Sequence, residues 1–590
     1  MSSIHAPVEA KPATGVARYV PILQWLPKYQ SKFLGGDAVS AVTVWAILIP
    51  EAMAYAAIAG VPVQYGLYAA PLAGLGYMIF GGSRQLFFGP DAAPAAVTAA
   101  VVVGVVGAHA STTKYVSVVA VLSLLVGVIF ILLGLLRLGW ISKFFAQPIL
   151  TGFVFGLGWF IAVGQLPKIV GIHKPKGDTV NVLVQTIGHV GDWKWTTVLV
   201  GVLALAVLFL LSRFVPKAPA AIVVTLLGIA AVAVFDLHTA HGVKVVGKIP
   251  TGFHFVSWSQ VSLHDITALI PGAFALMLVA FSQSVALAKT YAAEYHEPLD
   301  VNQEMFGYGA GNLGSGILQG FAATGSLSKT AISQQSGEKT PLSLGLTSLL
   351  VIVTILFLTG LFKNLPEAVL AAIIIHAVWG AMMPGKLVRL WRANRGEFVL
   401  AAITAAGVIV INILPGILIG VLASFFLLIH RLDHPRTVLM GRSPDEHYYV
   451  SLGPDGKGNG EVKQVPGVLI YGFRAPLLFT NYEDFSRDLL ARIDDADPRP
   501  GTVVIDCDAI SKTDTTGSSA LHDLHDTLAR AHIRMLLARV DHDVLEYLKR
   551  DGVLNDLGDH AVFPTVRDAV DAGQAGRTDG RESEPPARDK

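Results

Sequence analysis

Apolar segments follow one another through the first 430 residues of the chain. A helix needs about 20 apolar residues to cross about 30 Å of hydrocarbon. Most of the segments reach or approach that length, but the third, ninth and tenth are weakly hydrophobic and broken by Gly or Pro. The pattern predicts an α-helical polytopic protein of the lipid bilayer with fourteen spans, at about 37–60, 65–82, 88–108, 115–136, 146–167, 195–212, 218–236, 264–289, 301–319, 325–337, 342–361, 366–383, 397–413 and 415–429.

Positive charges gather in the short connections at one end of the predicted bundle. An even number of spans puts both chain termini on that same side. Because Lys and Arg are enriched in cytoplasmic loops, the sequence predicts a multi-pass protein of the cell membrane with cytoplasmic N- and C-termini. The charges are Arg84, Arg137, Lys143, Arg213, Lys217, Lys386, Arg389, Arg392 and Arg395.

Two interrupted segments occupy matching places in the two halves. In the first half, "SRQLFFGPDAAPAAV" (83–97) opens the third segment with a strand-like run, then Gly-Pro and small residues. In the second half, "LQGFAATGSLSKTAI" (318–332) opens the tenth segment in the same way. Seven spans per half force the halves into opposite orientations, which is the pattern of an inverted repeat. Interrupted segments in matching positions indicate a binding site near the middle of the membrane.

Lys329 stands among small polar residues at the start of the tenth segment. A charge at that depth is unfavourable and usually functional. Each interrupted segment would present a helix N-terminus with free N–H groups, and two such ends facing each other favour an anion. Lys329 would add a full positive charge, and Ser326 and Ser328 would add hydroxyl donors. Two other interpretations stay open: Lys329 reaches the cytoplasmic interface, or it pairs structurally with a buried acid.

Composition excludes several other classes of protein. The chain has 590 residues, of which 53% are hydrophobic and 15% charged, so it is too apolar for a soluble protein of this size. The net charge of +1 excludes a strongly basic nucleic-acid binder. The single cysteine, Cys507, excludes a disulfide framework, and its strand-like surroundings predict a buried thiol. The histidines lack metal-ligand spacing and no catalytic constellation is present, so we expect no enzyme, cofactor or metal site.

The stretch "GAGNLG" (309–314) matches a dinucleotide-binding pattern. No strand precedes it, and it lies inside an apolar segment. Small residues there permit close helix packing, which is the interpretation we favour.

The chain changes character after the last apolar segment. From about residue 440, strand-like runs such as "GTVVIDCDAI" alternate with amphipathic helical patterns such as "YEDFSRDLLARI". Alternating units of this kind predict a small cytoplasmic α/β domain. We therefore expect a cytoplasmic N-terminal segment (1–35), a transmembrane domain (36–430), the α/β domain (440–575) and a disordered tail (576–590).

Four stretches resemble the signature sequences of the sulfate permease (SulP) family, which includes the mammalian solute-carrier anion exchangers and prestin. The resemblance implies a seven-plus-seven inverted repeat, in which a core domain of spans 1–4 and 8–11 moves against a gate domain of spans 5–7 and 12–14. It also implies secondary transport of small anions by a homodimer. The stretches are "AILIPEAMAYAAIAGVPVQYGLYAA" (46–70), "GGSRQLFFGPDAA" (81–93), "LDVNQEM" (299–305) and "GSLSKTAISQQSGEKTPL" (325–342).

The same resemblance assigns an anion site to residues of this chain. Lys329 matches a position that is commonly Arg in animal members, which keeps the charge but loses the bidentate fork. Gln283 stands where many plant and bacterial symporters have Glu, so an acidic proton carrier is missing there. Asp91 stands where several animal exchangers carry a bulky apolar residue. The predicted site comprises Glu51, Tyr55, Gly89, Asp91, Ala92, Gln283, Ser326, Leu327, Ser328 and Lys329.

The stretch "VIDCDAISKTDTTGSSALHDLH" resembles the STAS domain (sulfate transporter and anti-sigma-factor antagonist). In the soluble antagonists, the hydroxyl residue before the Gly of this turn is a phosphorylation site. Thr516 holds that place here and is a possible regulatory phosphosite. The alternative is ordinary helix capping, in which Asp514 or a threonine caps the helix that follows.

The predicted function is secondary active transport of a small anion, such as sulfate, bicarbonate, chloride or a dicarboxylate, by an elevator-like movement. Proton symport is expected because a divalent anion would enter beside Glu51 and Asp91 only when one of them is protonated. Glu51 is the first choice, since Asp91 at a helix N-terminus is better stabilised as a carboxylate. The alternatives are anion exchange, sodium-coupled symport, a nucleobase permease of the same fold, and a membrane-anchored regulatory scaffold.

Overall fold

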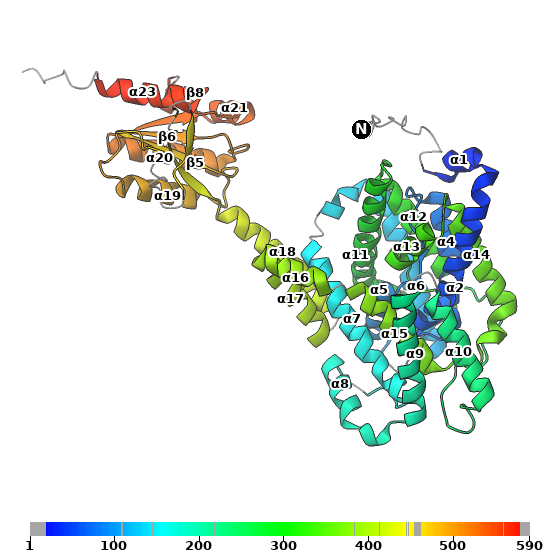
Figure 1. Cartoon of the computed structure of the whole chain (residues 1–590). Helices are drawn as coiled ribbons and strands as arrows, with labels where there is room; N and C mark the ends of the chain where they lie inside the picture. Colours follow the sequence, from blue (N-terminus) through cyan, green and yellow to red (C-terminus); the bar gives the residue numbers. More distant parts are fainter. Residues whose placement is uncertain are drawn as a thin grey trace, which may run out of the picture. The chain divides into compact units, whose positions relative to one another are not determined.

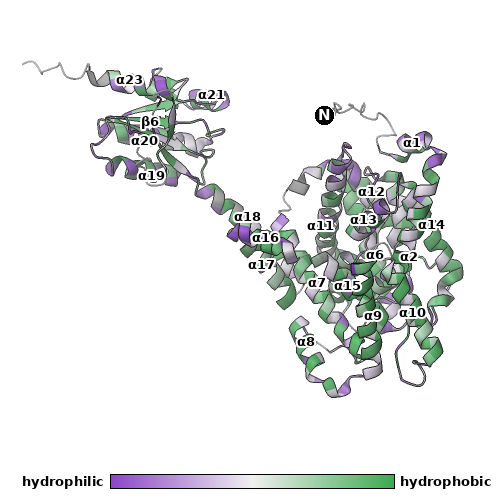
Figure 2. Cartoon of the chain, viewed as in Figure 1, coloured by the Kyte–Doolittle hydropathy of each residue, from purple (hydrophilic) through white to green (hydrophobic). Residues whose placement is uncertain are grey.

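The computed structural model divides the chain into two compact units, Met1–Ala423 and Ser424–Lys590. The first unit is a bundle of helices, and the second is a sheet with helices packed against it (Figure 1). In Figure 2 the helices of the first unit are mostly apolar, whereas those around the sheet carry both polar and apolar residues. The structure describes residues 19–107, 110–143, 147–175, 177–215, 219–382, 384–411, 413–443, 445, 448–453, 462–558 and 560–578.

Each of the fourteen predicted spans coincides with helix in the structure, so the predicted α-helical polytopic class is confirmed. The second span is divided between two helices, because the chain bends before Pro71, which begins the second one. The helices that correspond to the spans are α2 (Leu34–Ala59), α3 (Gln64–Tyr68), α4 (Pro71–Phe80), α5 (Ala92–Val106), α6 (Thr112–Leu135), α7 (Gln147–Val170), α9 (Trp195–Phe214), α10 (Ala220–Phe235), α11 (Leu263–Glu294), α12 (Val301–Ile317), α13 (Leu327–Gln335), α14 (Leu342–Val353), α15 (Glu367–Met382), α17 (Arg395–Val410) and α18 (Ile413–Asp433).

Within the described residues, seven helices are long and apolar enough to cross a membrane by length and composition. α5 and α13 are not among them, with 15 and nine residues. Both are short because each is preceded by an extended segment inside the bundle, β1 (Phe88–Gly89) before α5 and β2 (Thr324–Gly325) before α13. The two interrupted segments of the sequence are therefore extended backbone followed by a half-length helix.

Two further helices were not predicted as elements. α8 (Thr179–Gly188) lies in the long connection after α7, and α16 (Pro384–Ala393) carries Lys386, Arg389 and Arg392 between α15 and α17. Both have polar and apolar faces, so neither produces an apolar run. Before α2, the chain forms a short helix, α1 (Ile22–Trp25), and 3-10 turns at Leu26–Lys28 and Ser31–Phe33.

Small residues let α12 pack closely inside the bundle, between α4 and α6. A Cβ atom at Gly311 would lie 2.5 Å from the Phe88 ring, and one at Gly314 would lie 2.5 Å from the Leu72 carbonyl oxygen. Both glycines belong to "GAGNLG". The stretch serves helix packing, as we favoured from the sequence.

The second unit is a six-stranded mixed sheet with the strand order β4-β3-β5-β6-β7-β8. β3 pairs antiparallel with β4 and β5, and the strands from β5 to β8 are parallel, as alternating β and α elements require. The strands are β3 (Thr437–Arg442), β4 (Tyr449–Ser451), β5 (Val468–Phe473), β6 (Thr502–Asp506), β7 (Arg534–Ala538) and β8 (Val562–Phe563). The helices are α19 (Tyr482–Asp494), α20 (Thr515–Arg530), α21 (His542–Arg550), α22 (Val553–Leu557) and α23 (Val566–Thr578).

α23 corrects the start of the predicted tail. A disordered tail was expected from residue 576, but the helix continues to Thr578. Its buried residues Ala569 and Val570 pack in the core beside β6 and β7. The rest of the predicted tail, 579–590, lies outside the described residues.

Candidate functional site

The two half-helices begin at one short ladder. β1 and β2 pair antiparallel, with Phe88 opposite Gly325 and Gly89 opposite Thr324. The Ser326 N–H extends the ladder by donating to the Phe87 carbonyl oxygen at 2.9 Å. The N-terminal ends of α5 and α13, from opposite halves of the chain, are thereby tied to the same four residues. Each end directs backbone N–H groups and a partial positive charge away from its helix.

Lys329 lies in the first turn of α13 and is fully buried. Its ammonium lies 2.8 Å from the Glu51 carboxylate, 3.3 Å from the Ser326 hydroxyl and 5.1 Å from the centre of the Tyr55 ring. The Tyr55 hydroxyl also donates to Glu51, at 3.1 Å. Lys329 therefore does not reach an aqueous interface in this structure. It pairs with a buried acid, which is one of the alternatives that the sequence left open.

A second carboxylate faces the same lysine. Asp91 is the N-cap of α5 and accepts a hydrogen bond from the Ala92 N–H at 2.6 Å. It lies within electrostatic range of Lys329 and Glu51. The Lys329 ammonium thus pairs with Glu51 and lies within electrostatic range of Asp91, where the N-termini of two helices meet. Local charge here is close to balanced, because the two helix ends add partial positive charge to the lysine.

α11 supports the ladder from the side. The Ser284 hydroxyl lies 2.8 Å from that of Thr324 and accepts a hydrogen bond from the Gly325 N–H at 2.8 Å. The neighbouring Gln283 has a buried side-chain oxygen without a hydrogen-bond partner among the described residues. A buried acceptor of this kind favours a donor that arrives with a ligand or a solvent molecule.

The predicted site residues occupy two environments. Glu51, Tyr55, Ala92, Ser326 and Lys329 are buried around the two helix ends. Leu327 and Ser328, in the first turn of α13, are exposed, and the Ser328 hydroxyl lies 3.5 Å from that of Ser326. Asp91 and Gln283 are partly buried beside the first group, and Gly89 belongs to β1.

Sequence reasoning missed two buried acids that hold the surrounding helices. Asp37 at the start of α2 accepts hydrogen bonds from the Lys339 and Thr340 N–H groups, at 2.7 and 3.0 Å, and from the Thr340 hydroxyl. It thereby fixes the end of the "GSLSKTAISQQSGEKTPL" stretch to α2. The polar residues after α13 indicated that a hydrogen-bond partner was needed there. That partner, Asp37, lies about 300 positions earlier in the chain and could not be identified from the sequence.

Glu304 is the second such acid, and it is fully buried in α12. It accepts hydrogen bonds from the Tyr77 hydroxyl at 2.7 Å and from the Ser83 N–H at 2.5 Å. Ser83 begins the stretch that leads into β1. Glu304 of the "LDVNQEM" motif therefore fixes the segment that leads into β1 and the first half-helix. The only sequence signal for this role was an acidic residue inside an apolar span.

In the second unit, Asp514 caps α20. Its carboxylate accepts hydrogen bonds from the Gly517 N–H at 2.8 Å and from the Phe479 N–H at 2.9 Å. Thr516 lies in the first turn and is partly buried. Cys507 is buried, as predicted, and burial raises the pKa of its thiol to about 12, so it remains a neutral, inert thiol at physiological pH.

Comparisons with known proteins agree with this arrangement. Residues 34–404 match the model of the sulfate permease family, and residues 459–569 match that of the STAS domain. The chain is 33% identical over 563 residues to a probable sulfate transporter of Mycobacterium tuberculosis, covering 95% of this chain and 99% of the relative.

Two solved structures show the same fold. Murine solute carrier 26 family member A9, an anion transporter in the inward-facing state, superposes with a TM-score of 0.86 at 22% identity, over 96% of each chain. The transmembrane domain of the cyanobacterial bicarbonate transporter BicA gives 0.60 at 22% identity, over 67% of this chain and 98% of that one. The chain therefore belongs to the sulfate permease family, and it is a multi-pass anion transporter with a C-terminal STAS domain, not an enzyme.

Proposed function

We propose that the chain is a secondary active transporter of sulfate, coupled to protons, and that the anion binds between the N-terminal ends of α5 and α13. The ion pair between Lys329 and Glu51 is the observation that carries this proposal. The pair puts a buried positive charge where two helix ends already favour an anion. Sulfate is the first choice because relatives over nearly the whole chain are named as sulfate transporters.

The ion pair also supplies a route to coupling. While Glu51 is ionised, it occupies the Lys329 ammonium, and its charge repels a dianion. Protonation of Glu51 removes that repulsion and releases the ammonium to the incoming anion. Anion and proton would then occupy the site together and leave together, which is symport by electrostatics.

Asp91 is the less suitable proton carrier. Its carboxylate accepts the Ala92 N–H at the positive end of α5, and this interaction favours the ionised form. Glu51 lies inside α2, away from the ends of that helix, and it forms the ion pair with Lys329. Protonation of Glu51 therefore frees the ammonium that would bind the anion. We assign the proton to Glu51 and the orientation of the anion to Ser326, Lys329 and the two helix ends.

Movement of the site across the membrane would follow the grouping of helices. One set of helices packs with one another and includes the three that contact the ladder: α2, α4, α5, α6, α11, α12, α13 and α14. In a second set, α7 packs against α15 and α17. We propose that the first group moves against the second in an elevator-like step within a homodimer, with both termini in the cytoplasm. The membrane domain would comprise 36–430 and the STAS domain 440–575. We assign the STAS domain a regulatory or assembly role, with Thr516 as its possible phosphosite.

Purified protein in proteoliposomes tests substrate and coupling together. Preloaded vesicles would be given labelled sulfate in the presence of unlabelled sulfate, bicarbonate, chloride, fumarate or uracil. We expect sulfate to compete and uracil not to. An imposed inward proton gradient should accelerate net uptake, and uptake that is indifferent to this gradient would contradict proton coupling while leaving anion transport intact.

A further inference from the structure

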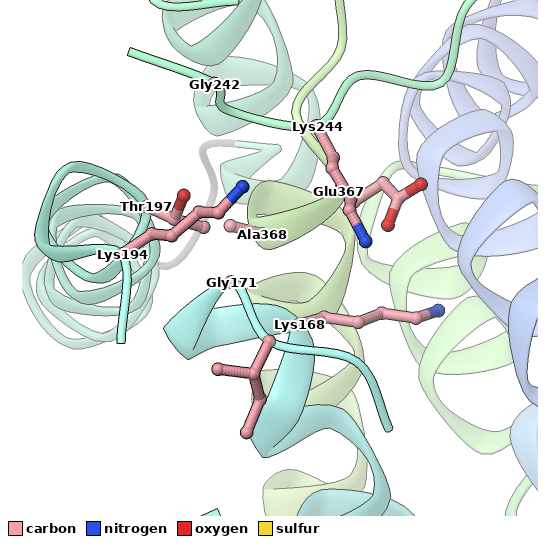
Figure 3. Close-up of a pocket in the computed structure, with 9 residues that line it drawn as sticks. Lys168, Gly171, Lys194, Thr197, Gly242, Lys244, Glu367 and Ala368 are labelled. Atoms are coloured by element: carbon pink, nitrogen blue, oxygen red, sulfur yellow. The ribbon is translucent and has the colours of Figure 1, made fainter. Parts of the chain in front are cut away.

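A small basic hollow lies in the first unit, away from the residues of the candidate site. The end of α7, the start of α9, the start of α15 and the connection after α10 surround it (Figure 3). Lys168, Lys194 and Lys244 line the hollow together with Thr197 and Glu367. None of these residues was singled out from the sequence.

Backbone hydrogen bonds bring these distant segments together. The Lys194 N–H donates to the Val170 carbonyl oxygen, at the end of α7, at 3.0 Å. The Glu367 N–H donates to the Lys244 carbonyl oxygen at 3.0 Å. The positions of the lysine backbones are therefore fixed by main-chain contacts, so the cluster is a property of the fold.

The charges around the hollow do not balance. Three lysines and a single carboxylate, that of Glu367, line the hollow, and Glu367 lies within electrostatic range of Lys168. Among the residues that the structure describes, none of the three lysines forms an ion pair with a carboxylate. An excess of lysines around one hollow, with Lys168 partly buried, makes the hollow electropositive and favours an anion in it.

A buried hydroxyl is the second observation. Thr197 is only 4% exposed and lines the hollow, and its Oγ1 atom has no hydrogen-bond partner in the described part of the chain. Buried polar groups almost always have a partner, so an unpaired one points to a missing ligand or solvent molecule. Thr197 also lies in the first turn of α9, a helix of 20 residues whose N-cap, Lys194, gives no side-chain hydrogen bond. Free N–H groups are thus available beside the hydroxyl.

We infer that this hollow binds a small tetrahedral oxyanion, such as sulfate or phosphate, as a second anion site separate from the one between α5 and α13. The anion would accept hydrogen bonds from the Thr197 hydroxyl and from the first turn of α9. Lys168, Lys194 and Lys244 would neutralise its charge. A bound anion would join the end of α7, the start of α9 and the connection after α10. It would thereby stabilise the packing of these segments beside α15.

Amine footprinting of the full-length protein tests the inference without a change to the candidate transport site. Purified protein is treated with an amine-reactive ester in sodium sulfate or in sodium gluconate of equal ionic strength, and labelling is quantified by mass spectrometry. Sulfate should slow the labelling of exposed Lys194 and Lys244 at least threefold. Lys248, an exposed lysine of the same connection, is the internal control and should label equally in both salts.

Matched variants assign the protection to the hollow. Thr197→Val keeps the shape of the side chain and removes the hydroxyl, so half-maximal protection should need at least tenfold more sulfate, while Thr197→Ser should behave as the parent. Equal slowing at Lys248, or protection unchanged in Thr197→Val, would overturn the inference. Loss of the protection in Lys329→Ala would overturn it as well, because the effect would then originate at the transport site.

Discussion

The Lys329 ammonium and the Glu51 carboxylate lie 2.8 Å apart, although they come from opposite halves of the chain. The pair is buried and shares its surroundings with Asp91 and Tyr55. A buried ion pair is not in itself evidence of stabilisation, because desolvation offsets much of the attraction. The pair lies at two helix N-termini, which favour an anion. We therefore interpret Glu51 as a counter-ion of Lys329 that the substrate anion replaces.

Replacing Lys329 should weaken anion binding. Lys329→Ala removes the charge that would face the anion, and we expect equilibrium sulfate binding to fall more than tenfold, about 1.4 kcal/mol. A hydrogen bond to a charged group contributes about 1.5–3 kcal/mol, so the loss of one such bond is enough to explain a tenfold weaker affinity. Lys329→Arg should be much milder. Binding of labelled sulfate to purified protein measures both variants.

The control for this experiment is the double variant Lys329→Ala/Glu51→Gln. Lys329→Ala alone leaves Glu51 buried without its cation, which could unfold the site for structural reasons. The double variant removes both charges together. If the folded double variant binds sulfate as tightly as the parent, Lys329 has only a structural role.

Proton coupling should depend on Glu51 more than on Asp91. In Glu51→Gln, sulfate exchange should persist, while stimulation of uptake by an inward proton gradient should be lost. Asp91→Asn should keep the stimulation, since an Asn side-chain oxygen can still accept the Ala92 N–H as the N-cap of α5. Initial uptake rates with and without the gradient give both numbers. Retained stimulation in Glu51→Gln, together with its loss in Asp91→Asn, would transfer the role to Asp91.

The STAS domain should be dispensable for substrate binding. α18 ends at Asp433 and β3 begins at Thr437, so a chain that stops after Pro435 keeps the last helix whole. We expect this truncated protein, once inserted and folded, to bind sulfate with the affinity of the full chain, even where its transport rate falls. If a monodisperse, folded truncated protein does not bind sulfate at equilibrium, the STAS domain is needed for substrate binding and this prediction is wrong.

Glu338 should make stability depend on pH. Its carboxylate lies in the connection between α13 and α14 and accepts from the Gln334 amide at 2.7 Å. Burial, with a further contribution from Asp37, raises the pKa of Glu338 to about 8. The folded state therefore holds a proton that the unfolded chain has already released, so this contribution is complete below about pH 4 and lost as pH rises through about 8.

Thermal denaturation of the purified protein between about pH 5.5 and about pH 8.5 measures this effect. The midpoint of Glu338→Gln should fall less steeply with pH than that of the parent and should exceed it at the alkaline end. Glu294→Gln removes an exposed carboxylate nearby and should leave the slope unchanged. Parallel curves for Glu338→Gln and the parent would show that Glu338 does not titrate in this range.

Capping by Asp514 should outweigh any structural role of Thr516. Asp514→Ala removes the acceptor for two backbone N–H groups and should destabilise α20 by about 1 kcal/mol. Thr516→Ala should change stability by less than about 0.5 kcal/mol. Hydrogen exchange of the α20 amides in the full-length protein reports both. A larger effect at Thr516 than at Asp514 would contradict this assignment.

The sequence was sufficient where one physical property dominates. Apolar length identified the spans from α2 to α18, although the signal for α13, with its polar first turn, was weak. Lys329 stood out because a charge is rare in such a segment. Its partner could not be identified from spacing, since pairing with Glu51 depends on how α2 packs beside α13. The basic hollow could not be predicted for the same reason. Lys168, Lys194 and Lys244 are ordinary loop and helix-end lysines in the sequence, and only the fold brings their segments together.

The ladder of β1 and β2 has a thermodynamic consequence. Because Phe88, Gly89, Thr324 and Gly325 hold both half-helix ends at one separation, an anion between them meets the same donors whichever compartment the site faces. A rigid site of this kind favours similar anion affinities on the two sides of the membrane, so the direction of net transport is set by the gradients across it. In the proposed cycle, one proton on Glu51 enters with a sulfate dianion, so each cycle moves one net negative charge inward. The pH gradient then drives accumulation, and an inside-negative membrane potential opposes it.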